Sequence, residues 1–561
     1  MDDPLLSVSE DFLLRNIIGS LYVNESSPAS PQVLEFLEAR EKTSHLGAKK
    51  NEKQSLEEFS QGIQALNRND NKEALSLFNK ALVSAPGSSK HIASFYRERS
   101  IALQKLKAYS ESLQDIERAL KLTESQEEKN YLEKRKTIIH ALNLNDTLNR
   151  LSVTPKDVDE QQEEIIYGES KELVGVSSAL ALEYNAKFGR HYVATQNINV
   201  GDVLMIQKPF VRVLLPESCK VLNGGIENSI CDNCLLSILN PIPCEYCRAV
   251  IYCSEECKLI GFKKMHKIEC QVTRRYPTNS RSLALRSLIE ATNRGKYLEE
   301  IYSKMEKIEK CKGDRTSGFN DGKLDGTKPE ALLSLLTHTD KRKDIMHWVN
   351  AAVVADTLRK DTDFLKGRAT YENTIKIGYL FLKLSYVCQM NLYGIQGSNT
   401  DRRIALAMYP VFNYLNNSCA NNALWYDKKD KKILRACKNI QKGEQVCVAY
   451  MTHAVVEKTA AERKKFFNEM KFFNCECEAC IRNYNFKCEL KRRLKIPQKL
   501  KKKLINKPND TKSLWELLKL VVNEYPGPCL EGKRIEFALV NAHLGSSNEE
   551  VPNILRLLKL L

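Results

Sequence analysis

The first part of the chain has apolar residues at helical spacing. Between about Leu56 and Leu122 they recur every three or four positions, and the clearest run, Ala74-Leu75-x2-Phe78-x2-Ala81-Leu82, is soon followed by Pro86. Gly62 lies twelve residues before Ala74, at a position where two paired helices would need a small residue. We therefore expect pairs of amphipathic helices in this region.

This pattern resembles the tetratricopeptide repeat, and a second unit follows with a displacement of 38 residues instead of the usual 34 or so. The matching positions are Ser100, Ser112, Ile116, Ala119 and Leu120. Such units cannot bury their apolar faces alone, so we expect a third helical pair or a neighbouring domain to cover the open end. The repeats form either a peptide-binding groove, with a peptide or a chaperone as partner, or a packed helical scaffold.

Farther along the chain the pattern becomes strand-like and then helical again. Short β-prone runs at 187–195 and 198–204 favour a domain of small strands. Residues 280–394 are helix-rich, and the last sixty residues are amphipathic. The stretch 143–170, rich in Asp, Glu and Gln, is typical of a linker. Together these patterns predict an α+β multidomain fold.

Composition narrows the class of protein. The 561 residues are 42% hydrophobic and 28% charged, which fits a globular chain of about three or four domains. No apolar run reaches the roughly 18 residues of a membrane span, and Met1-Asp2-Asp3-Pro4 lacks the basic start of a signal peptide. We expect a cytoplasmic and nuclear protein with no membrane contact. In that reducing setting the 18 cysteines bind metal or stay as buried thiols.

The chain is basic, with a formal net charge of +16. If eleven cysteines bind three zinc ions as thiolates, the charge falls to about +11. A basic balance fits an acidic partner, but scattered lysines give the same value. Since the sequence has no helix-turn-helix and no tandem base-reading fingers, specific nucleic-acid binding is disfavoured.

Eight zinc-ligand residues lie close together in the middle of the chain. Their spacing is Cys231-x2-Cys234-x9-Cys244-x2-Cys247-x5-Cys253-x3-Cys257-x8-His266-x3-Cys270. Two tetrahedral sets of soft ligands fit this spacing, which chance rarely produces. It resembles the MYND zinc finger, in which the two sets interleave. The resemblance implies one ion at Cys231, Cys234, Cys253 and Cys257, another at Cys244, Cys247, His266 and Cys270, and proline-containing peptides as partners of the finger.

A third cysteine group, Cys475-x-Cys477-x2-Cys480, offers three ligands, one fewer than a closed structural zinc site needs. Cys419 can supply the fourth. It lies in Asn416-Asn417-Ser418-Cys419, within a segment that begins at Tyr409.

That segment, together with Arg435-Ala436-x3-Ile440-x2-Gly443-Glu444 and Tyr450, resembles the SET domain of lysine methyltransferases. Its usual forms are an Asn-His-Ser-Cys knot, an Arg-Ala-x3-Ile-x2-Gly-Glu turn and an active-site tyrosine. In the SET- and MYND-domain (SMYD) family, a post-SET zinc joins the knot cysteine to the late cysteine trio.

The order of motifs resembles the SMYD subfamily with N-terminal tetratricopeptide repeats, over roughly residues 55–485. The resemblance implies a β-rich SET domain split by the finger and a helical insert. The expected domains are 1–142, tetratricopeptide-like helices; 143–170, linker; 171–230, first SET part; 231–270, MYND finger; 271–395, helical insert; 396–455, catalytic SET part; 456–484, post-SET zinc segment; and 485–561, C-terminal helices.

The resemblance also implies an activity and its residues. The reaction passes a methyl group from S-adenosylmethionine to the lysine amine of a histone or non-histone protein, and Tyr450 is the catalytic tyrosine. A narrow, dry site with a tyrosine hydroxyl suits this chemistry because the amine must lose its proton before it attacks. The cofactor residues implied are Gly189, Arg190, Asn391, Asn416, Asn417, Tyr450 and Phe473.

Three residues depart from the family pattern. Asn417 replaces the knot histidine, His191 replaces a glycine of the first loop, and Lys471 replaces an aromatic residue four positions before Cys475. A cation in an aromatic wall repels the sulfonium unless its stem carries it out to water. The sequence therefore leaves two functions open: an active methyltransferase, and a weak or inactive SET/MYND adaptor that binds proline-containing peptides in transcriptional regulation.

Overall fold

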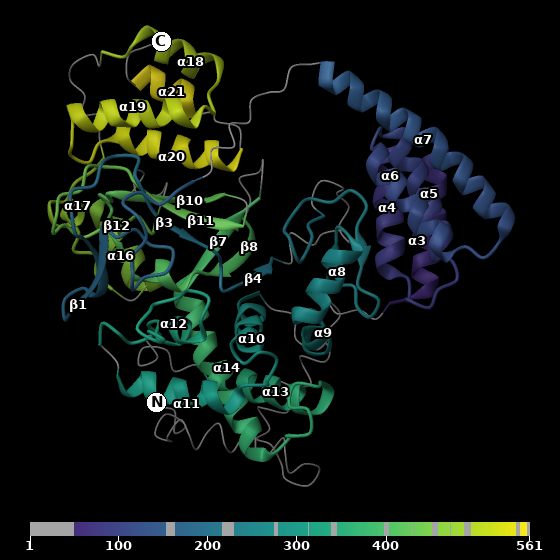
Figure 1. Cartoon of the computed structure of the whole chain (residues 1–561), viewed down its shortest axis with the longest axis horizontal. Coiled ribbons are helices and arrows are strands. Elements are labelled where there is room, and N and C mark those ends of the chain that lie inside the picture. The colour runs from purple at the N-terminus through teal and green to yellow at the C-terminus, as the bar shows by residue number, and fades with distance from the viewer. Residues whose placement is uncertain are drawn as a thin grey trace.

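The computed structural model describes residues 50–152, 163–215, 229–273, 279–311, 314–337, 345–397, 403–428, 430–451, 458–471, 473–486, 495–545 and 550–557. The N-terminal helices form a separate arm, and the finger lies between this arm and the main body (Figure 1). In the main body, small sheets occupy the middle, with the C-terminal helices on one side and the helical insert on the other.

The arm starts with two helical pairs at the places that the apolar pattern predicts. They are α3 (Glu52–Asn67), α4 (Asn71–Ser84), α5 (Ile92–Lys105) and α6 (Tyr109–Leu122). A Cβ atom on Gly62 would come within 2.6 Å of the Phe78 ring, so α3 and α4 approach too closely for any larger residue there. This confirms the close helix contact expected from Gly62.

A fifth helix, α7 (Gln126–Ser152), covers the open end of the repeats. Its residues Leu132 and Ile139 are buried in one cluster with Ile116 and Ala119 of α6. The predicted boundary at residue 142 and the linker from 143 are wrong, because α7 continues to Ser152. Extending an existing helix needs no new nucleation, so the polar turns stay helical although Leu144 is exposed.

The sheets join segments from both sides of the finger. β3 (Val203–Gln207) pairs with β11 (Lys431–Ala436), which pairs with β10 (Ala423–Lys428). β4 (Val211–Leu214) pairs with β8 (Arg403–Met408), which pairs with β7 (Leu392–Gln396). All these pairs are antiparallel. One split β-rich domain therefore exists, as the SET resemblance implies.

A hairpin of β1 (Leu180–Asn185) and β2 (Gly189–Ala194) lies against the later part of this domain. The Val446 amide donates to the Tyr192 carbonyl at 2.9 Å, and Val193 forms an isolated bridge with Gln445. Nearby, the short strands β9 (Asn416–Asn417) and β12 (Cys447–Val448) run parallel. This pairing sets Tyr450 beside the knot segment, a name used here for residues 416–422.

The finger contains β5 (Ile242–Pro243), β6 (Ile251–Tyr252), α8 (Glu255–Gly261), a π-helical turn (Phe262–His266) and α9 (Lys267–Thr273). The insert contains α10 (Asn279–Ala291), α11 (Leu298–Lys310), α12 (Pro329–Leu333), α13 (Ile345–Asp361) and α14 (Tyr371–Asn391). The predicted end of the helical insert at 395 is late by a few residues, because β7 begins at Leu392 to complete the three-stranded sheet.

After the catalytic part come α16 (Ala460–Lys471), α17 (Glu478–Ile481), α18 (Gln498–Asn506), α19 (Thr511–Glu524), α20 (Leu530–Leu544) and α21 (Glu550–Leu557). Leu514 and Leu518 of α19 share a buried cluster with Leu424 and Ile433 of the central sheet. The C-terminal helices thus cover that sheet. Among the described residues, no helix is long and apolar enough to span a membrane.

Candidate functional site

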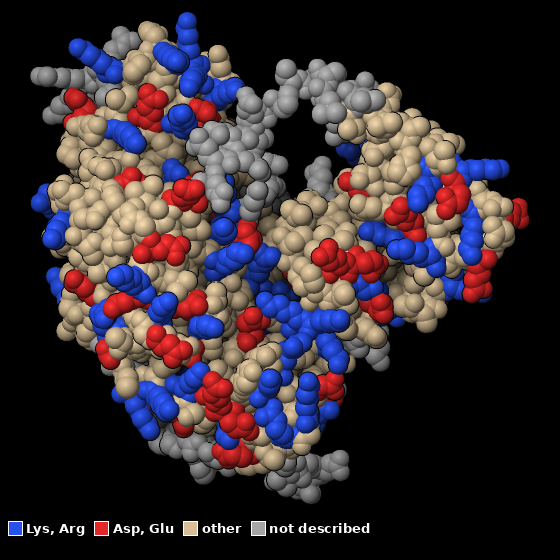
Figure 2. Space-filling view, viewed as in Figure 1, with Lys and Arg blue, Asp and Glu red and all other residues tan. Residues whose placement is uncertain are grey.

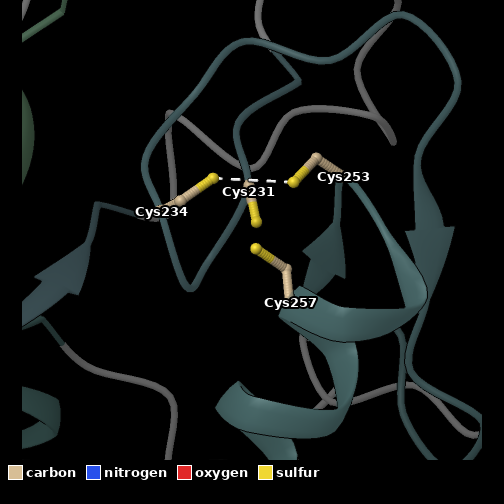
Figure 3. A group of neighbouring side chains, drawn as sticks. All are labelled: Cys231, Cys234, Cys253 and Cys257. Carbon is tan, nitrogen blue, oxygen red and sulfur yellow. Dashed lines mark hydrogen bonds between the residues drawn. The ribbon is translucent and has the colours of Figure 1, made fainter.

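The first cysteine group forms a closed cluster. Figure 3 shows the sulfur atoms of Cys231, Cys234, Cys253 and Cys257 directed toward one centre. All four lie within 4.8 Å of one another, and the Sγ atoms of Cys234 and Cys253 are 3.6 Å apart. Tetrahedral zinc with Zn–S bonds of about 2.3 Å requires a sulfur separation of about 3.8 Å. The cluster therefore fits a zinc ion.

The second group consists of Cys244, Cys247, His266 and Cys270, whose ligand atoms also lie within 4.8 Å of one another. The Nε2 atom of His266 is 3.3 Å from the Cys247 sulfur. His266 is the last residue of the π-helical turn, which lies between α8 and α9. Both clusters contain the residues that the interleaved MYND pattern predicts.

The third group brings Cys419 together with Cys475, Cys477 and Cys480. The sulfur atoms of Cys419 and Cys480 are 3.6 Å apart, and the Cys419 amide lies 3.4 Å from the Cys477 sulfur. The predicted fourth ligand is therefore in place. Three zinc ions fit the described residues: the first and third sites offer four thiolates each, and the second offers three thiolates and an imidazole.

The first loop of the predicted cofactor site ends at Gly189. Gly189 has φ of +63°, a backbone conformation that favours glycine, and a Cβ atom there would meet no atom within 4 Å. Open space at this backbone fits the close approach of a cofactor. His191, the first departure from the family pattern, is buried, and its Nδ1 donates to the Gly189 carbonyl at 2.9 Å. The histidine side chain at position 191 therefore stabilises the loop through this hydrogen bond.

Arg190 points away from that open space. Its Nη1 donates to the Ser317 carbonyl at 2.5 Å, its Nη2 donates to the Ser334 carbonyl, and its guanidinium lies 4.6 Å from the centre of the Tyr414 ring. The side chain fastens the loop to the helical insert. A contact between Arg190 and a cofactor would need its backbone, and that role stays a prediction.

The knot segment holds the loop and the tyrosine together. Asn416 Nδ2 donates to the Phe188 carbonyl at 3.1 Å. Asn417 donates from Nδ2 to the Cys475 sulfur at 3.3 Å and accepts the Tyr450 amide at 3.0 Å. The second departure, Asn417, thus links the third zinc site to the tyrosine backbone with both ends of its amide.

Two aromatic residues meet beside this link. The Tyr450 and Phe473 rings are 6.4 Å apart and nearly perpendicular, and Phe467 stacks on Phe473 at 5.2 Å. The Tyr450 hydroxyl donates to the Leu415 carbonyl at 2.8 Å. Partial burial, with Cys447 nearby, raises the pKa of Tyr450, so its hydroxyl is protonated at neutral pH.

The last predicted cofactor residue, Asn391, and the third departure, Lys471, each lie at the end of a helix. Asn391 closes α14, and its Nδ2 donates to the carbonyls of Leu336 at 2.8 Å and Val387 at 2.9 Å. Leu336 follows Ser334, the partner of Arg190, so Asn391 and Arg190 hold the same stretch after α12. Lys471, the third departure, ends α16, and its side chain is outside the described residues.

Comparison with known proteins agrees with this geometry. The MYND finger family matches residues 231–270. Protein-lysine N-methyltransferase SMYD4 of Mus musculus is 26% identical over 388 residues, covering 57% of this chain and 48% of that protein. SMYD4 of Danio rerio is 22% identical over 556 residues, covering 85% and 71%. Histone-lysine N-methyltransferase SMYD3 of Homo sapiens is 25% identical over 300 residues, covering 53% and 60%.

These similarities, together with the MYND finger match, support an SMYD family member. The split sheet and the three metal clusters agree with the same family. The N-terminal helical repeats of this chain fit the subfamily to which the SMYD4 relatives belong. The chain spans about half the length of the first SMYD4 relatives that it matches.

Sequence reasoning missed Tyr393, an aromatic residue of the site. It lies on β7, two residues after Asn391, and its ring packs edge-on against Tyr409, Phe412 and Trp425. Burial raises the pKa of Tyr393, and the nearby Tyr450 raises it further. The signal in the sequence was a short β-prone run directly after Asn391, which forms β7 and carries Tyr393.

Arg286 on α10 was also missed, because no motif in the sequence marks it. Its guanidinium is buried between Asp232, which follows the ligand Cys231, and Glu269, which precedes the ligand Cys270. It also donates to the Arg212 carbonyl of β4 at 2.8 Å. Arg286 therefore fixes both zinc sites of the finger to the split sheet.

Proposed function

We propose that this SMYD protein is an S-adenosylmethionine-dependent protein-lysine N-methyltransferase. The observation that carries the proposal is the pair of hydrogen bonds made by the Asn417 amide, one to the Cys475 sulfur and one to the Tyr450 backbone. Through it, the third zinc site, the knot segment and the tyrosine form one unit. The names of the relatives support the same activity.

Several residues would hold the cofactor. The open backbone at Gly189 and the amide groups of Asn391 and Asn416 suit its amino-acid end, and the ring of Phe473 suits its adenine. One face of Phe473 is covered by Phe467, so the other face is the one left for stacking. When bound, S-adenosylmethionine supplies an electrophilic methyl group on a cationic sulfonium.

Tyr450 would orient the substrate amine. Its hydroxyl proton is engaged with the Leu415 carbonyl, so the phenolic oxygen keeps its lone pairs as acceptors for an amine N–H. The residue is 40% exposed, so the site can be reached from solvent. Aromatic rings near it, above all the partly buried Tyr393, lower the local polarity and favour the neutral amine that attacks.

The test is calorimetric titration of the full chain with S-adenosylmethionine, followed by methylation of a native protein extract. We expect binding, and labelling that Tyr450→Phe removes while binding persists. Tyr246→Phe, a change on the exposed surface of the finger, is the matched control and keeps labelling. No binding at millimolar cofactor would contradict the proposal, and equal labelling by Tyr450→Phe would contradict the role of Tyr450.

The second candidate function is an adaptor in transcriptional regulation that binds proline-containing peptides through the finger. The departure at Lys471 favours it, because a cation in an aromatic wall would repel the sulfonium of the cofactor. The finger also has an apolar face, where the exposed ring of Tyr246 stacks on Phe262 at 5.8 Å beside the exposed Leu259. Aromatic surfaces of this kind suit polyproline segments. Binding of such a peptide without any cofactor binding would favour the adaptor.

Location and further partners belong to the same proposal. We propose that the protein acts in the cytoplasm and nucleus, where lysine-bearing substrates and regulatory partners occur. Acidic and basic side chains are interspersed over most of the face in Figure 2, which supports protein partners over nucleic acid. A peptide or chaperone partner of the N-terminal helices would need a face other than the one that meets the finger.

A further inference from the structure

Three consecutive carbonyl groups of the finger are bound by three different helices of the arm. The Leu239 carbonyl accepts a hydrogen bond from Asn79 of α4 at 3.1 Å. The Asn240 carbonyl accepts from Arg118 of α6 at 3.1 Å, and the Pro241 carbonyl accepts from Arg99 of α5 at 3.0 Å. These partners are more than 120 residues apart in the sequence. The contact is therefore the recognition of a short segment by a distant helical surface.

The donors are held in place by contacts within the arm itself. Arg99 binds both oxygens of Asp115 at 2.7 and 2.9 Å, and both side chains are fully buried. Arg99 also donates to the Asn79 oxygen at 2.8 Å, and Arg118 donates to Asp115 at 2.7 Å. A bidentate Arg–Asp pair fixes the guanidinium plane, so little side-chain entropy is lost on binding.

The finger segment also donates hydrogen bonds to the arm. Asn240 Nδ2 donates to the Glu111 carbonyl at 3.2 Å and to Gln114 at 3.1 Å, both on α6. Asn240 is buried, and Leu239 packs against the apolar cluster around Phe78. Apolar contact and polar exchange in both directions are features of a specific interface.

A second contact lies beside the second zinc site. Val83, at the end of α4, is 1% exposed and shares an apolar cluster with Cys244, Cys247 and Cys270. Arg248, which follows the ligand Cys247, donates to the Gln54 oxygen of α3 at 3.0 Å. The helices thus form part of the wall around this zinc ion.

We propose that the α4–α6 face of the N-terminal helices is a binding site for the finger's own segment Leu239–Pro243, and that this contact retains the second zinc ion. The ligand class of this site is a short extended segment with successive free carbonyls and one amide side chain. Because its occupant belongs to the same chain, this face serves the finger and does not recruit an outside peptide. The proposal is independent of methyl transfer.

The experiment uses the full chain loaded with three zinc ions. Excess chelator with a metallochromic indicator measures the release of each ion, and cysteine alkylation with mass spectrometry identifies the ligands that become free. Gln54→Ala with Arg118→Ala removes contacts from the helix side. Asn240→Ala removes them from the finger side without changing any helix.

We expect both variants to release the ion of Cys244, Cys247 and Cys270 about tenfold faster, as the loss of one or two hydrogen bonds implies. The ion of Cys419 and Cys475 serves as an internal control, and its release should be unchanged. The matched control variant is Arg97→Ala with Gln104→Ala, residues that contact Glu128 and Arg135 of α7 and not the finger. It should behave like the wild type.

Hydrogen exchange separates the proposal from simple loss of folding. In Asn240→Ala, exchange should rise in residues 244–252 while the amides of α3–α6 stay protected. Equal zinc release in wild type and Asn240→Ala, with unchanged exchange, would overturn the proposal. Faster release in the Arg97 control as well would also overturn it, because the effect would then be general destabilisation.

Discussion

Arg286 and Glu269 are joined by two hydrogen bonds, from Nε at 2.7 Å and from Nη2 at 3.0 Å. The same guanidinium binds Asp232 at 2.8 and 2.9 Å, so one cation serves two carboxylates from opposite ends of the finger. All three side chains are at least nine-tenths buried. A buried cluster with one positive and two negative groups depends strongly on its single cation.

The first prediction concerns this cluster. Arg286→Met leaves two uncompensated buried carboxylates, so we expect a loss of about 3–5 kcal/mol in the free energy of unfolding. Chemical denaturation of the wild type and the variant measures this loss of unfolding free energy. The control Arg294→Met removes an exposed donor to the Lys263 carbonyl and should cost less than about 1 kcal/mol. Similar losses in both variants would contradict a special role for Arg286.

The second prediction concerns the third zinc site. Cys419→Ser should lower the zinc content from three ions to two, because three thiolates remain at that site. Cys447→Ser is the control, since burial raises the pKa of the Cys447 thiol to about 12 and it lies outside the cluster. Elemental analysis of purified protein gives the count. Three ions in Cys419→Ser would show that Cys419 is not a ligand.

Under the proposed function, the same variant should lose affinity for S-adenosylmethionine, because Asn417 then loses its fixed contact with Cys475. A drop of at least about tenfold in the association constant, equivalent to about 1.4 kcal/mol, is expected by titration calorimetry. Unchanged affinity would separate the zinc site from the cofactor site.

The third prediction uses two glycines with the same backbone strain. Gly189 and Gly168 have φ of +63° and +76°, and a Cβ atom at either position would meet no atom within 4 Å. Alanine at either should cost about 1–2 kcal/mol of stability. Only Gly189→Ala should also weaken cofactor binding, since Gly189 faces the proposed site. Equal effects on binding would remove Gly189 from that site.

The fourth prediction concerns pH. His543 stacks on Tyr426 at 3.6 Å, and burial, with a contribution from Arg435, lowers its pKa to about 3. Because this pKa is lowered, the unfolded chain binds the proton first, so stability falls as pH drops from about 6.5 toward 3. The slope approaches about 1.4 kcal/mol per pH unit.

His543→Phe keeps the ring stack and removes the titration. Between pH 7 and pH 5 its α20 amides should lose less protection than those of the wild type in hydrogen exchange. The control His91→Phe, on the N-terminal side of α5 in the arm, leaves the α20 profile unchanged. Parallel profiles for wild type and His543→Phe would contradict a neutral buried histidine.

The zinc ligands could be predicted because each lies in a motif whose spacing encodes geometry. Cys419 could also be predicted, because a group of three cysteine ligands needs a fourth ligand to close a structural zinc site. Other contacts have no such local code. The side chain of Arg190 turns inward because the carbonyls of Ser317 and Ser334 lie there, more than 120 residues away. Arg286 binds carboxylates 17 and 54 residues away, and only the fold brings them together.

Helix ends were similarly hard to predict. The composition of residues 143–152 favours a loop, yet α7 runs on because the preceding turns have already overcome the cost of nucleation. Local preference is weak against a helix that has started.

The pairing across the finger has a consequence for biosynthesis. Val211 pairs with Met408, 197 residues later, so β4 has no neighbour while the ribosome is still making the insert. The arm and the finger have their own partners by then and can fold first. Until β8 has been synthesised, β4 keeps an unpaired edge. A chaperone is therefore needed most in the interval before residue 408 emerges.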